Sequence, residues 1–136
     1  MKKEEIEKFE QGLKEEYELY GKLLDLLREE LSFAEKEDRD FFISILPKKL
    51  ELMKLLDEKD NTIKEFKEKW KEEGNKKSSD YENIKILLEK MGEKLKEIIT
   101  IDEEIQSIYR KWQSNIEETN LKANILRAGK AYGKKD

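Results

Sequence analysis

Residues 81–126 limit the folds open to this chain more than any other part of it. Apolar residues recur there at alternating steps of four and three, the heptad pattern of one face of a long helix. Only Asp102 interrupts the series Ile84, Leu88, Met91, Leu95, Ile98, Ile105, Tyr109, Trp112 and Ile116. Ser79 and Glu82 precede it with the spacing of a helix-capping box. The pattern predicts one helix of roughly 70 Å, which needs long helical neighbours.

A second heptad series lies in residues 3–36. Its members are Ile6, Phe9, Leu13, Tyr17, Tyr20, Leu24, Leu27, Leu31 and Ala34. Leu23 and Leu26 widen this apolar stripe, as expected of a helix with two neighbours. The polar run at residues 35–40 predicts a chain reversal. We therefore expect an all-α, elongated antiparallel three-helix bundle with helices over residues 3–36, 44–73 and 80–128, the third parallel to the first.

The start of the middle helix has two solutions. Proline is tolerated in a first helical turn, so Pro47 favours a helix that begins near Ser44. Alternatively, Asp38 or Asp40 caps an earlier start and the helix bends at Pro47. Both versions continue through the apolar residues Leu52, Met53, Leu56, Ile63, Phe66 and Trp70.

The composition argues against catalysis. The chain of 136 residues, a single domain by its length, contains no histidine and no cysteine, and 46% of its residues are charged. Imidazole and thiolate chemistry are therefore absent, and a catalytic carboxylate needs burial or a charged neighbour. Only Asp102 interrupts an apolar series. We favour a role for it as a polar residue that sets the helix register, with Ile101 taking over the core contact, rather than a role in binding a ligand. We predict no enzyme activity, no cofactor and no metal site.

Charge and hydropathy indicate the environment of the protein. The formal net charge is −4 and opposes nucleic-acid binding, although basic residues gather in residues 121–136. We expect those residues to complement the helix dipole and residues 129–136 to form a disordered tail. No apolar run approaches the length of a membrane span, and the start of the chain shows no targeting segment. We therefore expect a soluble, cytoplasmic protein.

The end of the third helix lacks a partner within the chain. The first helix is long enough to pair with only the first 34 residues or so of the third helix. Roughly 20 Å of the third helix, after Asn115, is therefore left unpaired. The apolar stripe also changes phase there, which indicates a different neighbour. The predicted partner-binding residues are Ile116, Asn120, Leu121, Asn124, Ile125, Ala128 and Tyr132. The alternatives are that this segment folds back, forms a homodimer or frays.

Three runs of sequence resemble a known family. They are LLDLLREEL at residues 23–31, LELMKLL at residues 50–56 and LRAGKAYG at residues 126–133. With the three-helix pattern, they look like the FlgN/FliT-like bacterial flagellar export chaperones.

The resemblance implies a small cytoplasmic helical protein without enzymatic activity. It would hold a late flagellar subunit, the hook–filament junction or filament-cap protein, and deliver it to the type III export apparatus. The family uses its C-terminal part for the subunit, which corresponds here to residues 116–132. The alternative is a structural coiled-coil or adaptor protein that self-associates through the same segment.

Overall fold

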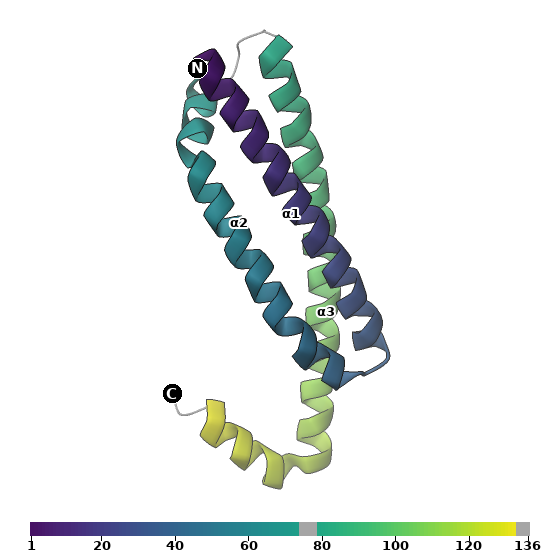
Figure 1. The fold of residues 1–136 in the computed structure, drawn as a ribbon. Helices are drawn as coiled ribbons and strands as arrows, with labels where there is room; N and C mark the ends of the chain where they lie inside the picture. Colours follow the sequence, from purple (N-terminus) through teal and green to yellow (C-terminus); the bar gives the residue numbers. More distant parts are fainter. Residues whose placement is uncertain (74–78, 133–136) are drawn as a thin grey trace.

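The computed structural model describes the backbone of residues 1–73 and 79–132, and the side chains of residues 1–73 and 81–113. Within these residues the chain forms three helices, α1 (Lys3–Glu35), α2 (Arg39–Glu73) and α3 (Ser79–Tyr132). α2 runs antiparallel to α1, and α3 runs parallel to α1 (Figure 1). α1 packs against both other helices. The predicted all-α, antiparallel three-helix architecture is confirmed.

The core lies along α1 in two apolar clusters. The cluster near the start of α1 contains Ile6, Phe9, Leu13, Ile63, Tyr81, Ile84 and Met91. The second cluster contains Leu23, Leu24, Leu27, Ile98 and Ile105. Phe9 packs against Trp70 of α2 with ring centroids 6.2 Å apart, as the antiparallel order predicts. The apolar heptad positions of α1 thus serve two neighbours at once.

α1 and α2 approach each other closely at Gly12. A Cβ atom built on Gly12 would lie 2.2 Å from Cγ2 of Ile63, well inside van der Waals contact. Ile63 is itself buried, so it has little room to move. The absence of a side chain at Gly12 therefore sets the spacing of the two helices here.

The turn between α1 and α2 decides where α2 begins. The N–H of Asp38 donates to the carbonyl of Phe33 at 2.9 Å and that of Glu37 to Ala34 at 3.0 Å, a Schellman ending for α1. The Asp38 carboxylate then accepts the N–H of Phe41 at 3.1 Å and caps α2. The predicted start at Ser44 is wrong, because Asp38 has already capped the helix.

The early start and the internal proline of the alternative are confirmed, whereas its bend at Pro47 stays a prediction. α2 begins at Arg39 and contains Pro47 in its interior. The Ser44 hydroxyl donates to the carbonyl of Phe41 at 2.8 Å instead of capping a helix. Proline has no N–H, so the helical hydrogen bond to the carbonyl four residues earlier, that of Ile43, is missing.

Replacement of Glu37 by glycine is expected to stabilise the protein. Glu37 has a φ of 58°, in the left-handed region that disfavours residues with a Cβ. Glycine removes this cost but gains freedom in the unfolded chain, so we expect a net gain of about 0.5–1 kcal/mol. Thermal unfolding followed by circular dichroism checks this, with Glu35→Gly in the last turn of α1 as the destabilising control. A lower melting temperature for Glu37→Gly would contradict the expectation.

The bounds of α3 agree with the prediction at its start and differ at its end. The helix begins at Ser79, but the side chain of that residue lies outside the described ones, so the predicted capping bond stays a prediction. The helix ends at Tyr132 rather than near residue 128. Residues 129–132, expected in a disordered tail, therefore belong to the helix. Residues 133–136 lie outside the described part.

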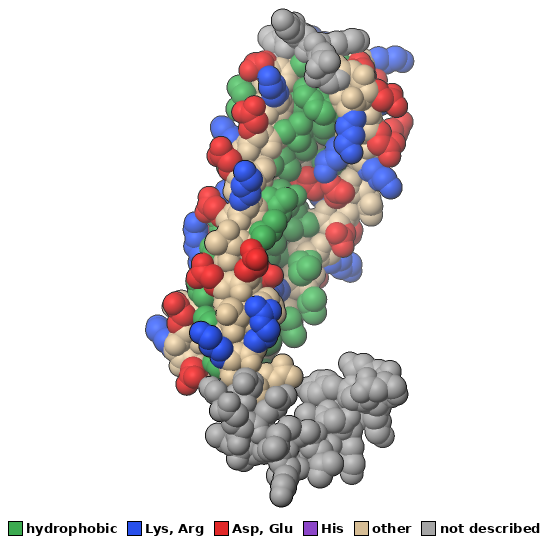
Figure 2. Space-filling model, turned by 180° about the vertical axis from the view of Figure 1, so that it is seen from behind, with side chains coloured by type: hydrophobic (Ala, Val, Ile, Leu, Met, Phe, Trp, Pro, Cys, Tyr) green, Lys and Arg blue, Asp and Glu red, His purple; other side chains and the backbone are tan. Residues whose placement is uncertain are grey.

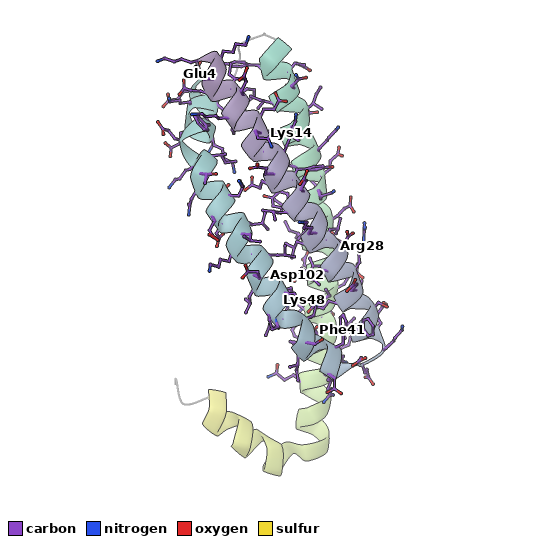
Figure 3. All side chains as sticks on the ribbon, viewed as in Figure 1. Glu4, Lys14, Arg28, Phe41, Lys48 and Asp102 are labelled. Atoms are coloured by element: carbon purple, nitrogen blue, oxygen red, sulfur yellow. The ribbon has the colours of Figure 1, made fainter. Side chains whose placement is uncertain are left out.

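Charged side chains cover the outer faces of the helices, as Figure 2 shows for the face on which α2 and α3 lie. Glu10 and Lys14 form an ion pair within α1 at 3.0 Å. Arg28 of α1 (Figure 3) joins Glu97 of α3 at 3.0 Å. Exposed pairs of this kind contribute at most about 1 kcal/mol each, so the apolar clusters supply most of the stability.

Candidate binding surfaces

α3 extends past the other two helices. Trp112 of α3 is buried, and the guanidinium of Arg39, the first residue of α2, lies 5.3 Å from its ring centroid. The start of α2 and the turn that precedes it therefore lie at the level of Trp112. α3 continues to Tyr132, beyond the α1–α2 turn (Figure 1). The predicted extension of α3 beyond the bundle is confirmed, whereas the absence of a partner for it within the chain stays a prediction. We call residues 113–132 the overhang.

All the predicted partner-binding residues belong to the overhang. They are Ile116, Asn120, Leu121, Asn124, Ile125, Ala128 and Tyr132, and their backbone is helical. Their side chains lie outside the described residues, so their role in binding stays a prediction.

A second surface lies between α2 and α3 on the side away from α1. α1 packs against both helices, whereas α2 and α3 have no close backbone approach in the described part of the chain. Figure 2 shows apolar side chains gathered between these two helices. We call this surface the α2/α3 face and define it by six partly or largely exposed residues, Ile43, Leu46, Leu50, Met53, Leu95 and Ile99.

Contacts between α2 and α3 set the register of this face. The rings of Phe42 and Tyr109 stack with centroids 4.4 Å apart, and Lys49 Nζ lies 3.9 Å from Asp102 Oδ1. Residues three or four positions apart share a helix face. Leu46 and Met53 therefore lie one turn on either side of Lys49, and Ile99 lies one turn from Asp102.

Two members of the face differ from the sequence-based expectation. Met53 and Leu95 belong to predicted apolar series, yet they are 49% and 40% exposed. A heptad pattern places residues on a stripe, but the separation of the neighbouring helices decides how much of that stripe is covered. Here the two helices stand apart and leave the outer part of both stripes open.

A buried carboxylate joins α1 to α2 between the two apolar clusters. Glu16 is 2% exposed, and its Oε1 lies 3.6 Å from Lys67 Nζ without a hydrogen-bond partner in the described part of the protein. Lys67 also forms an ion pair with Asp60. Burial raises the pKa of the Glu16 carboxyl, whereas the hydrogen bond from Lys67 lowers that of Asp60. We call Glu16, Asp60 and Lys67 the acid–lysine cluster.

A second buried carboxylate joins all three helices. Glu30 of α1 is 2% exposed and accepts a hydrogen bond of 2.7 Å from the hydroxyl of Tyr109 in α3. Lys49 of α2 lies 3.0 Å from its other oxygen. Burial, the hydrogen bond to Glu30 and the Glu30 charge together raise the pKa of Tyr109 well above its usual range. Glu30 Oε2 thus has a hydrogen bond from α3, and Oε1 has the Lys49 cation of α2 but no hydrogen bond in the described part of the protein. A carboxylate held from two other helices is typical of a structural network.

Asp102 occupies the polar position that the sequence predicts. Its side chain is 45% exposed and lies beside Lys49. Ile101 packs against the second apolar cluster, as expected if it takes over the core contact. Glu16 and Glu30, in contrast, were not predicted to be buried. Their signal in the sequence is their place three residues after Leu13 and Leu27, on the α1 stripe that Leu23 and Leu26 also widen.

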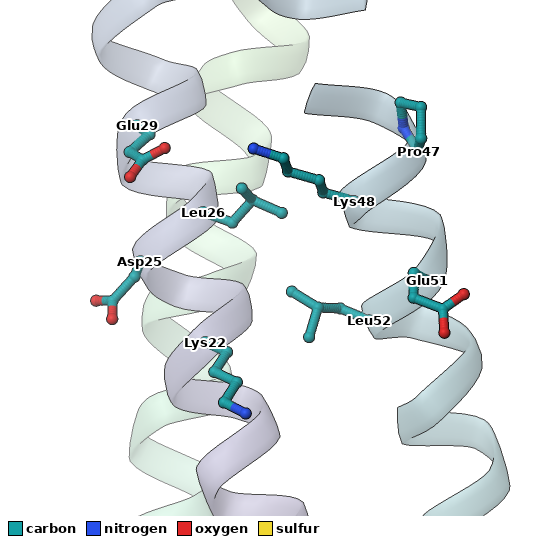
Figure 4. Close-up of a pocket in the computed structure, with 8 residues that line it drawn as sticks. All are labelled: Lys22, Asp25, Leu26, Glu29, Pro47, Lys48, Glu51 and Leu52. Carbon is teal, nitrogen blue, oxygen red and sulfur yellow. The ribbon is translucent and has the colours of Figure 1, made fainter. Parts of the chain in front are cut away.

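A shallow pocket of about 550 Å³ lies between α1 and α2. Leu26 and Leu52 point toward each other across it, and Pro47 lies at one end (Figure 4). Charged residues surround this apolar floor, namely Lys22, Asp25, Glu29, Lys48 and Glu51. The pocket offers apolar contact with charges of both signs at its rim, an arrangement without a positioned nucleophile or acid pair.

The described residues carry no group of three or more acidic residues placed to hold a metal ion. No helix among the described residues combines the length and the apolar character needed to cross a bilayer. Comparison of the chain with protein-family models, curated proteins and solved structures gives no match. The surfaces themselves therefore carry the functional argument.

Proposed function

We propose that this protein is a helix-binding chaperone without catalytic activity, of the kind that serves flagellar type III export. Its client would be a late flagellar subunit, the hook–filament junction or filament-cap protein, held in the cytoplasm until it passes to the export apparatus. The chain supports this proposal with an elongated three-helix bundle and with the sequence runs that resemble the FlgN/FliT-like family.

The overhang is the single observation that carries the proposal. Its 20 residues, 113–132, amount to roughly 30 Å of helix measured along the chain, and α3 bends sharply within this segment (Figure 1). A helix of that length is rarely stable in water without packing against an apolar partner. In the sequence of this segment, Leu121, Ile125 and Ala128 recur at the spacing of one helix face.

An amphipathic helix is the kind of client that this segment would bind. Subunits of a helical filament assemble through amphipathic terminal helices, and such a helix packs its apolar face against another apolar helix face. Leu121 and Ile125 would supply buried contact, and Asn120 and Asn124 hydrogen bonds. Lys122 and Arg127 at the rim would mainly raise the association rate.

Removal of the overhang tests the proposed function. A chain that ends at Asn115 should lose binding to peptides from the terminal helices of the junction and cap subunits, because the contact residues are gone. In the full chain, Leu121→Asp with Ile125→Asp should weaken binding at least a hundredfold, about 3 kcal/mol or more. Isothermal titration calorimetry measures both effects.

The matched control is Ile86→Asp, which places a charge at a 42% exposed position of α3 far from the overhang. It should leave peptide binding unchanged. Undiminished binding by the truncated chain would place the client site elsewhere. Loss of the bundle's thermal transition on truncation would instead show that the overhang is part of the core.

Self-association through the same segment is the second candidate function. It would make the protein a structural coiled-coil or adaptor that meets itself rather than a client. Sedimentation velocity separates the two. A dimer that dissociates in the Leu121→Asp, Ile125→Asp variant, with no peptide binding by the unsubstituted protein, would favour the structural role.

A further inference from the structure

The α2/α3 face exposes a large apolar surface. Ile43 is 71% exposed, Leu50 57% and Ile99 50%, and the other three members are at least 40% exposed. Six large side chains at about half exposure present on the order of 500 Å² of apolar surface, near the upper limit for the largest patch on a monomeric protein. A patch of that size indicates an interface.

We propose that the α2/α3 face is the interface of a homodimer in which α2 and α3 of two copies form a four-helix layer. Two copies that bury this face on each other would remove on the order of 1,000 Å² of apolar surface from water. With the surrounding polar residues, this total lies within the range of about 1,200–2,000 Å² for stable protein interfaces. The area therefore suits a second copy of the chain.

The charges around the face also fit a second copy. One turn from the apolar residues, α2 exposes Arg39, Asp40, Lys54 and Asp57, and α3 exposes Lys96 and Glu103. These six charges sum to zero, although the chain as a whole carries −4. A two-fold axis brings the same patch onto itself, so a balanced rim avoids the repulsion that a rim of one sign would cause.

The arrangement of the helices allows such packing. α2 and α3 are antiparallel and both rest on α1, so α1 lies on the far side of the layer and leaves their outer surfaces free. Facing pairs of antiparallel helices bury their stripes in the manner of a four-helix bundle. The overhang lies beyond the α1–α2 turn (Figure 1), and none of the six residues that define the face belongs to it.

The mass of the full-length protein in solution tests the dimer. Sedimentation equilibrium between 1 and 100 µM, concentrations suited to micromolar or tighter association, should give twice the chain mass of 16.3 kDa. The combined variant Leu50→Asp, Ile99→Asp should be monomeric over the same range. Its dissociation constant should rise at least a hundredfold, because two charges would be buried on each side of the interface.

Two controls separate this interface from other causes. Ile86→Asp adds a charge at a similarly exposed site beside Glu10 and Lys14 of α1, and it should remain dimeric. Leu121→Asp with Ile125→Asp should also remain dimeric, because these residues lie in the overhang. Circular dichroism and thermal unfolding confirm that each variant is folded.

The proposal is overturned by a monomeric unsubstituted protein at 100 µM, or by a dimer that persists in the Leu50→Asp, Ile99→Asp variant. Dissociation caused only by the overhang substitutions would also overturn it and assign the dimer to that segment. Introduced cysteines give an independent readout, because the chain has none of its own. Leu46→Cys, Leu50→Cys and Met53→Cys should include a variant that forms a disulfide-linked dimer on mild oxidation, whereas Ile86→Cys should not.

Discussion

Replacement of Phe9 by alanine is expected to lower the free energy of unfolding by about 4 kcal/mol. Phe9 has no solvent-exposed surface and contacts aromatic rings of α2 at two positions, Phe66 and Trp70, each with centroids 6.2 Å away. Removal of the Phe9 ring takes apolar contact from both α2 and α3. It also leaves a cavity that the three long helices can close only in part. Urea denaturation followed by circular dichroism measures the change.

Truncation of an exposed apolar side chain to alanine provides the comparison. Ile86→Ala removes an apolar side chain that is 42% exposed, so it should cost less than about 1 kcal/mol. For a chain of this size, the loss at Phe9 should lower the melting temperature by roughly 10–20 °C. Equal effects at Phe9 and Ile86 would contradict the burial of Phe9 at the centre of the first apolar cluster.

Replacement of Lys67 by methionine is expected to destabilise the protein by about 2–3 kcal/mol at pH 7.5. Removing one partner of a buried ion pair leaves the other charge uncompensated, a loss of about 3–5 kcal/mol for fully buried pairs. Lys67 is 33% exposed at its side chain, so water reduces the effect. Glu16 and Asp60 would then face each other without a cation between them.

The pH dependence of this loss follows from the two carboxyl groups. Burial raises the pKa of Glu16 above its ordinary value of 4.5, and removal of Lys67 raises it further. A raised pKa gives stability that is fully present below the ordinary value and is lost as the pH rises through the folded value. Asp60 works in the opposite sense, because Lys67 lowers its pKa below 3.8 and stabilises the folded state above that value. Lys67→Met should therefore differ less from the unsubstituted protein at pH 4.5 than at pH 7.5.

Glu16→Gln is the matched variant for this experiment. Glutamine keeps the shape of the side chain and cannot ionise, while Lys67 keeps its ion pair with Asp60. In the Glu16→Gln background, the destabilisation caused by Lys67→Met should be nearly the same at pH 4.5 and at pH 7.5. A destabilisation by Lys67→Met that is the same at pH 4.5 and 7.5 would show that Glu16 does not titrate in response to the lysine.

The helices themselves follow from local patterns in the sequence. The heptad series in residues 3–36 and 81–126, and the short polar run between the first two helices, were enough to predict three long antiparallel helices and an unpaired end of α3. Periodicity predicts these features because it depends on neighbouring residues alone. The start of α2 was less determined, since Asp38 and Ser44 both offer a capping side chain, and only the Schellman ending of α1 selects Asp38.

The surfaces that matter for binding depend on how far apart the helices stand. Met53 and Leu95 lie on apolar stripes, but their exposure is a consequence of α2 and α3 both resting on α1 without a close approach to each other. Burial of Glu16 depends in the same way on Lys67, which belongs to a different helix, α2. The sequence by itself determined the number and order of the helices and most of their extent, apart from the start of α2 and the end of α3, because hydrogen bonds and periodic side chains act within each helix. The tertiary structure alone decided which faces are open and which charges are buried, because these depend on contacts between residues distant in sequence.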